Sequence, residues 1–333
     1  MRASTPPSLA PAPGAESSAP PEGPQPRPRF PLAIALFIAT FLSTTYMGAY
    51  WAGEEEASVI SMAGLAYSLP LMSILLAHEL GHYFAAMLHG VRASPPFFIP
   101  MPFMPFGTMG AIILMPDRIR SRNALFDIGA AGPLAGLAVA LPVLAYGIAQ
   151  SPVLPLDLKP GQLLMQEGHS LLYKAMLWLL KGPFPEGHDI LLGPTALAGW
   201  VGLLITMINL IPAVQLDGGH VAYALFGERQ ELYSRRLRKG LLWAAAATGL
   251  AYGLPAYWRG ARGEALWNEA SVGMQWLVWW LLLRVMVGAT RREHPQTDPG
   301  PLSPRRRKLA WFTLSLFVLL FMPAWLRVST VPG

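Results

Sequence analysis

Long apolar segments alternate with short polar ones along most of the chain, and their lengths suit a lipid bilayer. Seven such runs lie at about 31–51, 60–88, 126–149, 190–212, 240–257, 272–289 and 309–326. Each is close to the roughly 20 residues that a helix needs to cross the hydrocarbon core. The pattern therefore predicts an all-α polytopic membrane protein with about seven transmembrane helices.

Two segments depart from this pattern. Residues 171–180 are apolar but too short to cross, and Lys174 and Lys181 bracket most of the run; we expect an interfacial helix there, with a re-entrant segment as the alternative. Residues 1–30 are rich in proline, alanine and serine and lack apolar periodicity, so we expect a disordered cytoplasmic tail. The terminus does not begin with a signal-peptide pattern, and the first span is expected to remain as an anchor.

Basic residues in the short polar segments predict the orientation. They are concentrated in residues 2–29, 92–122, 229–239 and 291–308, which all fall on one side of a seven-span arrangement, while the acidic residues 54–56 fall on the other. Lysine and arginine favour the cytoplasmic side of a membrane. We therefore expect a multi-pass protein of a bacterial cytoplasmic membrane, with the N-terminus in the cytoplasm and the C-terminus outside.

Composition narrows the classes of function. Charged residues make up 13% of the chain, against about 25% in soluble domains. The net charge of +6 comes from the loops that set orientation, so no nucleic-acid partner is expected. Cysteine is absent, which excludes a disulfide framework, a thiol nucleophile and any cysteine-ligated metal. A metal site in this chain must use histidine, aspartate and glutamate.

The second apolar run contains the segment His78-Glu79-Leu80-Gly81-His82, an HExxH pattern. Ionisable groups at bilayer depth cost roughly 2.5–3.5 kcal/mol each on insertion scales, so three of them within five residues need a compensating partner. Positions four apart on a helix differ by about 40° and about 6 Å, so His78 and His82 can bind one cation and leave Glu79 beside it as a base. The alternative is a pair of packed histidines and a buried glutamate in a transporter helix.

A third ligand is needed, because catalytic zinc sites use three protein ligands. His89 would lie about 10 Å beyond His82 on a continuous helix, and we interpret it as a polar group at the helix end. The better candidate is Asp217, at the end of the fourth run and on the same membrane side as HExxH. Pro212 is expected to end that helix, and Gly218-Gly219 to form a tight turn that points the carboxylate into the bundle.

Other polar or small residues near these motifs have candidate roles. Asn209, one turn before the break, is positioned to hydrogen-bond a substrate backbone or a developing oxyanion. His220 remains a minor rival to Asp217 as ligand. Gly132 and Gly136 form a small-xxx-small pattern that favours close helix packing, with a direct substrate role as the alternative. Asp127 is expected to cap the N-terminus of the third span.

Residues 94–116 are rich in proline, glycine and β-favouring Phe and Ile and lack a helical period. A membrane-associated β-hairpin or loop near the active site is expected there, with an amphipathic cytoplasmic loop as the alternative. A strand edge beside the metal would hold an extended peptide. Proline at Thr108 or Ile112 is expected to remove an amide donor from that edge.

HELGH in one span and N-x-x-P-x-x-x-L-D-G in a later one together resemble the site-2 protease family of intramembrane zinc metalloproteases. Residues 95–100, 107–113 and 126–136 are similar to a branch without a PDZ domain that includes plant chloroplast members. The loop at about 150–189 is too short for such a domain. The resemblance implies a domain at 31–328 with a catalytic core at about 60–225.

By this resemblance, His78, His82 and Asp217 bind one Zn²⁺ per chain, Glu79 is the general base and Asn209 contacts the substrate. The implied function is endoproteolysis of the transmembrane segments of single-span or polytopic membrane proteins, as in regulated intramembrane proteolysis. The partners are then the substrate and the lipid bilayer, with the oligomeric state left open. A divalent-metal transporter and a non-catalytic relative that binds membrane proteins are the alternatives. The lack of an internal repeat argues against the transporter.

Overall fold

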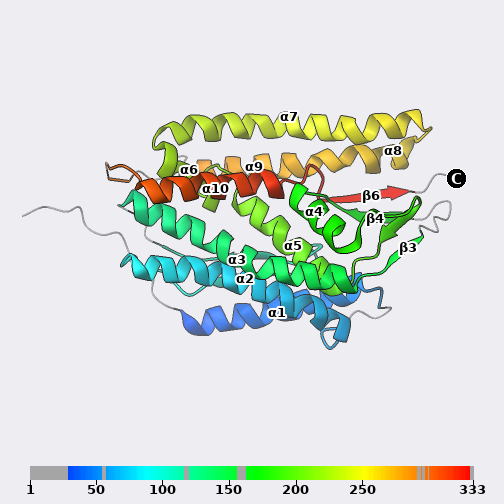
Figure 1. The fold of residues 1–333 in the computed structure, drawn as a ribbon, viewed down its shortest axis with the longest axis horizontal. Coiled ribbons are helices and arrows are strands. Elements are labelled where there is room, and N and C mark those ends of the chain that lie inside the picture. The colour runs from blue at the N-terminus through cyan, green and yellow to red at the C-terminus, as the bar shows by residue number, and fades with distance from the viewer. Residues whose placement is uncertain are drawn as a thin grey trace, which may run out of the picture.

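The computed structural model describes residues 29–54, 58–115, 119, 121–155, 163–290, 294, 297–298 and 300–330. The predicted disordered tail, apart from its last two residues, lies outside the described residues. Long helices run side by side along the long axis of the molecule (Figure 1). They are α1 (Phe30–Trp51), α2 (Met62–Leu88), α3 (Arg122–Gln150), α7 (Arg229–Trp258), α9 (Met274–Thr290) and α10 (Pro304–Leu320). The shorter α5 (Pro194–Asn209) runs obliquely to them.

Within the described part of the chain, four segments are long and apolar enough to cross a membrane: α1, α2, α3 and the stretch Gly263–Gly288. That stretch joins α8 (Gly263–Ala270), a 3₁₀ turn at Ser271–Gly273 and most of α9. Helix α5 is apolar but shorter. The prediction of a mostly helical membrane protein is thus confirmed in its coarse form, and the number of seven spans stays a prediction.

Helix α2, which carries the HExxH motif, begins at a side-chain cap, since the Ser61 hydroxyl accepts from the Gly64 amide at 2.9 Å. Pro70 lies inside the helix and cannot donate to the Ala66 carbonyl four residues earlier. Thr195 of α5 donates to that carbonyl instead, at 3.0 Å. The interruption is therefore satisfied by a neighbouring helix, as polar backbone in a lipid environment requires.

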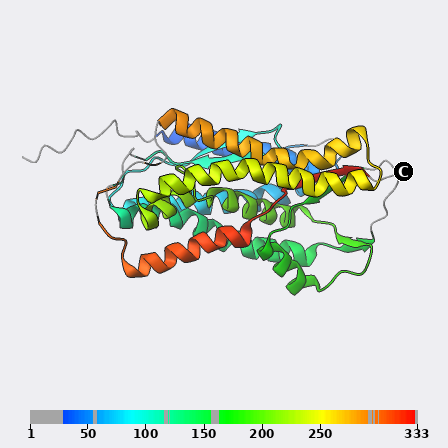
Figure 2. The same cartoon turned by 90° about the horizontal axis from the view of Figure 1, so that it is seen from above.

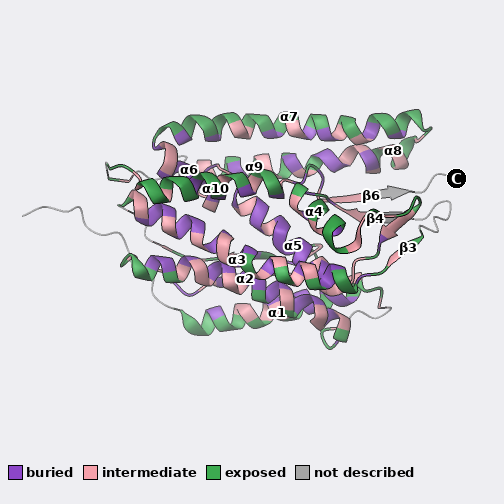
Figure 3. Cartoon of the chain, viewed as in Figure 1, coloured by how far each residue is buried: buried purple, intermediate pink, exposed green. Residues whose placement is uncertain are grey.

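Helices α2, α3 and α5 form the centre of the molecule (Figure 3), and no residue of α5 is exposed. Their surfaces meet closely at glycine. A Cβ on Gly199 of α5 would lie 2.6 Å from the Leu144 backbone of α3, and one on Gly147 of α3 would lie 2.3 Å from the Ala196 backbone of α5. Small residues that let backbones approach are the usual basis of helix packing in membranes.

The expected hairpin is present as β1 (Phe97–Met101) and β2 (Gly107–Ile112), paired antiparallel. Its tip is held by hydrogen bonds from α1 and α2. Ser43 donates to the Gly107 carbonyl at 2.6 Å, Tyr67 to the Phe106 carbonyl at 3.1 Å, and the Trp51 indole to the Pro105 carbonyl. The hairpin therefore packs against α1 and α2, while its association with the membrane stays a prediction.

Smaller elements gather at the end of the molecule where the C-terminus lies (Figure 1, Figure 2). Strand β3 (Val153–Pro155) pairs with β5 (His188–Ile190), and β4 (Leu163–Glu167) with β6 (Leu326–Thr330). Between them, α4 (Leu171–Lys181) begins at a Ser170 cap and buries Tyr173 and Leu177, one turn apart. The short helix predicted at 171–180 is therefore present.

Candidate metal centre

Helix α2 presents the three polar side chains of the HExxH motif to the interior of the bundle. His78, Glu79 and His82 are 4%, 6% and 7% exposed. The histidines are one helical turn apart, and their Nε2 atoms lie 3.1 Å from each other. The sequence prediction that both rings can reach one cation is met by this geometry.

Asp217 approaches from a different part of the chain. Helix α5 ends at Asn209, and a turn containing Pro212 leads to α6 (Asp217–Phe226), which begins at the aspartate. Val214 lies in this turn with a positive φ of 55°, and its amide donates to the Ser234 hydroxyl of α7 at 3.1 Å. The predicted break of the helix before Asp217 is confirmed.

Gly218 and Gly219 do not form the tight turn that the sequence predicted. Both residues lie in the first turn of α6, and neither is recorded with a positive φ. A Cβ on Gly218 would lie 2.1 Å from the Leu210 carbonyl oxygen, and one on Gly219 would lie 2.4 Å from that of Val214. Glycine at these positions lets α6 pack directly on the turn that precedes it.

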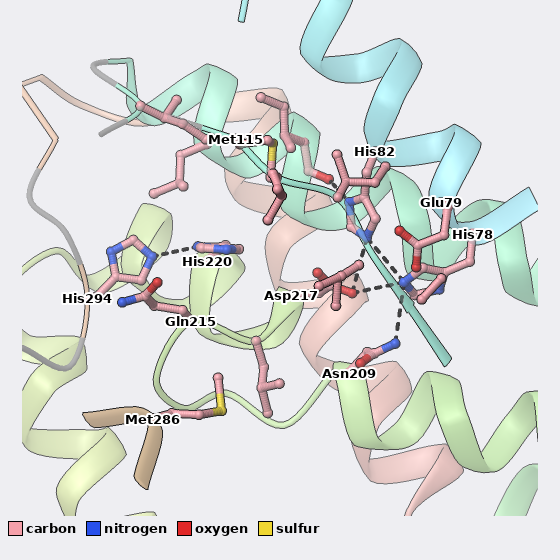
Figure 4. Close-up of a pocket in the computed structure, with 18 of the residues that line it drawn as sticks. His78, Glu79, His82, Met115, Asn209, Gln215, Asp217, His220, Met286 and His294 are labelled. Atoms are coloured by element: carbon pink, nitrogen blue, oxygen red, sulfur yellow. Dashed lines mark hydrogen bonds and ion pairs between the residues drawn. The ribbon is translucent and has the colours of Figure 1, made fainter. Parts of the chain in front are cut away.

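The donor atoms of His78, His82 and Asp217 form a nearly equilateral triangle (Figure 4). Asp217 Oδ2 lies 3.1 Å from His78 Nε2 and 3.3 Å from His82 Nε2. Ligands bound tetrahedrally to zinc at about 2.0–2.1 Å are about 3.3–3.4 Å apart. Two imidazoles and one carboxylate at this spacing therefore fit a zinc ion, and three protein ligands leave a fourth position open.

Backbone contacts from α3 fix the His82 ring. Its Nδ1–H donates to the Ile128 carbonyl at 2.7 Å, which leaves Nε2 as the metal-facing nitrogen. Gly132 provides the space for the ring, since a Cβ there would lie 2.0 Å from His82 Nε2; one on Gly136 would lie 3.1 Å from the His78 Cβ. The glycine pair thus packs helices together, as predicted, and it does so directly against the two histidines.

Asn209 and Glu79 also line the site. The Asn209 amide nitrogen lies 3.4 Å from His78 Nε2, so its side chain points to the centre. Its contact with a substrate stays a prediction. A cavity of about 400 Å³ opens beside the triangle and is also lined by Ala111–Met115 and Gln215. It therefore has room for a peptide segment next to the candidate metal ligands.

His89 and Asp127 were each expected at the end of a helix, and the structure agrees for His89 alone. His89 follows the end of α2 and pairs with Asp127 at 2.7 Å, which agrees with its interpretation as a helix-end group. Asp127 is not an N-terminal cap: α3 begins at Arg122 after a Ser121 cap. The helix begins before the apolar run, so Asp127 lies within it and faces His89 and Arg306.

His220 and His294 form a second histidine pair in the cavity wall. His220 Nδ1 lies 2.7 Å from His294 Nε2, and the His294 ring stacks on Tyr223 at 4.2 Å. His220 is not part of the triangle of donor atoms. His294 and the Ile128 carbonyl were not predictable from the sequence, because neither belongs to a spaced motif; the pair Gly132 and Gly136 was the visible signal for the α3 contact.

A histidine pair on one helix, a remote carboxylate and an adjacent glutamate form a centre of the kind found in zinc metallopeptidases. The chain belongs to peptidase family M50, whose model matches residues 66–252. This confirms the resemblance to the site-2 proteases. No solved structure matches the chain.

Curated relatives are plant chloroplast proteins. The chain is 34% identical over 184 residues to "Probable zinc metalloprotease EGY2, chloroplastic" of Oryza sativa subsp. indica, covering 55% of this chain and 33% of the relative. It is 33% identical over 168 residues to "Probable zinc metalloprotease EGY1, chloroplastic" of Arabidopsis thaliana, covering 50% and 30%. With "Probable zinc metallopeptidase EGY3, chloroplastic" of Arabidopsis thaliana it shares 26% over 279 residues, covering 75% and 47%. The chain thus spans about a third to a half of the length of these relatives.

Proposed function

We propose that this chain is a zinc-dependent intramembrane endopeptidase that cleaves transmembrane segments of single-span or polytopic membrane proteins. The observation that carries the proposal is the triangle of His78, His82 and Asp217 with Glu79 beside it, on a helix apolar enough to cross a membrane. Membership of peptidase family M50 supports it. A bilayer-embedded centre with these groups is suited to substrates that are themselves in the bilayer.

His78, His82 and Asp217 would hold one Zn²⁺. Zinc bound there would supply Lewis-acid chemistry: it would lower the pKa of a water molecule to near neutral and polarise a peptide carbonyl. Burial of His78 and His82 limits competition from bulk solvent for the ion, and the Ile128 carbonyl keeps the His82 ring in one orientation.

Glu79 is the general base of this proposal. Its carboxylate lines the cavity beside the ligands and takes a proton from the water that attacks the scissile carbonyl carbon. As the carbon–nitrogen bond breaks, the same carboxyl group delivers that proton to the leaving amine. Asn209, whose amide points to the centre, would donate to the substrate carbonyl oxygen as negative charge develops on it.

Strand β2 is the proposed support for an unwound substrate. Leu114 faces the β1 side of the hairpin, because its carbonyl accepts from the Ser94 amide and its amide donates to the Ser94 hydroxyl, both at 2.9 Å. Leu114 lies just beyond the end of β2. Because backbone groups alternate in direction along an extended chain, we infer that those of Ile112 also face β1 and that those of Ala111 and Ile113 point to the opposite edge. Among the described strands, β2 pairs with β1 alone.

That outward edge lies in the cavity wall beside the metal ligands. A transmembrane helix hides its amides in internal hydrogen bonds, so a few residues must unwind before the scissile carbonyl is accessible. Pairing with Ala111 and Ile113 would satisfy the exposed groups of the unwound segment. On this proposal, proline at Ile112 would act on the hairpin, whereas proline at Ala111 or Ile113 would act on the substrate edge. The expectation for proline at Thr108 stays a prediction.

The proposal includes the seven-span topology in a bacterial cytoplasmic membrane, with the N-terminus in the cytoplasm. Spans α5, α7 and α10 would join the four segments that meet the length and hydropathy of a membrane helix. HELGH then lies in the last third of α2, toward the cytoplasmic side, where water can reach the cavity along α6 and the start of α7.

Cleavage by the purified protein in lipid nanodiscs tests this function. A helical membrane peptide with a fluorophore and quencher on its two ends is the probe, and Glu79→Gln is the matched variant. We expect the parent to cleave within the membrane segment and Glu79→Gln to be inactive with its zinc content unchanged, because the base is lost and the ligands are kept. Equal cleavage by both proteins would contradict the role of Glu79, and failure of the parent to cleave several membrane peptides would contradict the function.

A further inference from the structure

The first turn of α10 is tied to the catalytic helices by a compact polar cluster. Arg306 donates from Nε to Asp127 Oδ1 at 2.8 Å and from Nη2 to Oδ2 at 2.6 Å. His89, at the end of α2, lies 2.7 Å from the same Asp127 oxygen. One carboxylate thus joins the end of α2, the second turn of α3 and the beginning of α10.

Two further hydrogen bonds hold α10 on α3. The Ser303 amide donates to the Asn123 side chain at 3.1 Å, and Arg122 donates to the Gly300 carbonyl at 3.1 Å. A bidentate arginine–carboxylate pair fixes orientation as well as distance. The start of α10 is therefore held on α3 in a defined position.

The position of α3 at this level decides the orientation of a candidate metal ligand. Asp127 directly precedes Ile128, whose carbonyl accepts from His82 Nδ1–H at 2.7 Å. One turn later, Gly132 lies against the same imidazole. A shift of α3 relative to α2 would therefore move the hydrogen-bond acceptor and the wall that together hold the His82 ring.

Helix α10 also packs on the helix that begins with the acidic ligand. Leu125 and Phe126 of α3, Val221 and Tyr223 of α6, and Ala310 of α10 belong to one buried apolar cluster. Asp217 is the first residue of α6. The same helix thus contacts both α3, which orients His82, and α6, which presents Asp217.

We propose that α10 is a brace of the metal centre and that Arg306 is a positioning residue, which sets the His82 imidazole through Asp127 and the backbone of α3. The inference rests on the proposed zinc site. It assigns a role to a helix beyond residues 66–252, the part of the chain that matches the family. Its consequence is that removal of the half-buried Arg306 side chain should weaken zinc binding without any change to a ligand.

The test measures zinc affinity of the full-length protein in nanodiscs by competition with a chelating dye, for the parent, Arg306→Gln and Arg306→Lys. The control is Arg327→Gln, because Arg327 makes a similar two-point pair with Glu269, 2.9 Å on both sides, away from the metal centre. Loss of an outer hydrogen-bond partner typically costs about 10- to 100-fold in metal affinity. We expect Arg306→Gln to lose about 10-fold and Arg327→Gln to match the parent.

Arg306→Lys should fall between the parent and Arg306→Gln, because lysine keeps the charge but loses the planar fork. Saturating zinc should restore peptide cleavage in Arg306→Gln, which a variant with a globally loosened fold would not show. Should Arg306→Gln fail to fold, Asp127→Asn and Arg306→Lys carry the same expectation of weakened zinc binding.

Parental zinc affinity in the folded Arg306 and Asp127 variants would overturn the brace, and so would an equal loss in Arg327→Gln. A parent protein that binds no zinc would instead overturn the proposed function. The two failures are therefore distinguishable in one series of titrations.

Discussion

Substitution of Gly132 by alanine should weaken zinc binding, although Gly132 is not itself a ligand. The added Cβ would lie 2.0 Å from His82 Nε2, 2.4 Å from Cδ2 and 2.5 Å from Cε1, whereas real Cβ contacts essentially never fall below 3.0 Å. The ring or α3 must therefore move by about 1 Å. Metal–ligand distances tolerate deviations of only about 0.2 Å, so His82 would no longer share an ion with His78 and Asp217.

The expected loss of zinc affinity in Gly132→Ala exceeds the roughly 10- to 100-fold that loss of an outer partner typically costs, because the donor atom itself is displaced. Overpacking should also destabilise the fold by about 1–3 kcal/mol. Dye competition gives the zinc affinity, and thermal unfolding in nanodiscs gives the stability.

Two matched glycines separate these effects. Gly136→Ala places its Cβ 3.1 Å from the His78 Cβ, which needs a shift of a few tenths of an ångström, and Gly288→Ala meets nothing within 4 Å. Zinc affinity should fall in the order Gly288→Ala, Gly136→Ala, Gly132→Ala. If Gly132→Ala binds zinc as tightly as Gly288→Ala, the contact between α3 and His82 does not hold the ligand.

Two further predictions concern substrate presentation and topology. Ala111→Pro should slow cleavage of the membrane peptide with zinc affinity unchanged, because it removes an amide from the outward edge of β2; an unaltered rate in a folded, zinc-loaded variant would refute pairing at that edge. A reporter fused after Arg238 should be cytoplasmic and one fused after Arg262 external, as protease protection or cysteine labelling would show, and the reverse pattern would refute the seven-span topology.

The site was most predictable where ionisable residues fall within an apolar segment that is expected to lie in lipid. Charged groups in the second apolar run had to share a partner, and Asp217 was identifiable because it ends another run on the same membrane side. The structure brings their donor atoms together. The helix break at Pro212 was predictable for a different reason: proline lacks the amide hydrogen that would continue the hydrogen-bond pattern of α5.

Details that depend on packing were not predictable. Apolar residues mark where a helix becomes buried and not where it begins, so the Ser121 cap of α3 was missed and Asp127 was assigned the wrong role. The direction of the β2 amides depends on an irregularity between Phe98 and Pro100, where Gly110 has a φ of +94°. Alternation in the sequence cannot locate such a bulge, so the edge on which the amides of Thr108 and Ile112 lie was not predictable.

X-ray absorption at the zinc edge tests the central claim most directly. For the parent protein loaded with one zinc, the account predicts a low-coordinate site with two imidazole nitrogens and oxygen ligands at about 2.0–2.2 Å. Asp217→Ala should lose zinc on dialysis against a weak chelator, while Glu79→Gln should keep the parental spectrum. A six-coordinate oxygen environment in the parent, or an unchanged spectrum at full occupancy in Asp217→Ala, would contradict the assignment of the metal to His78, His82 and Asp217.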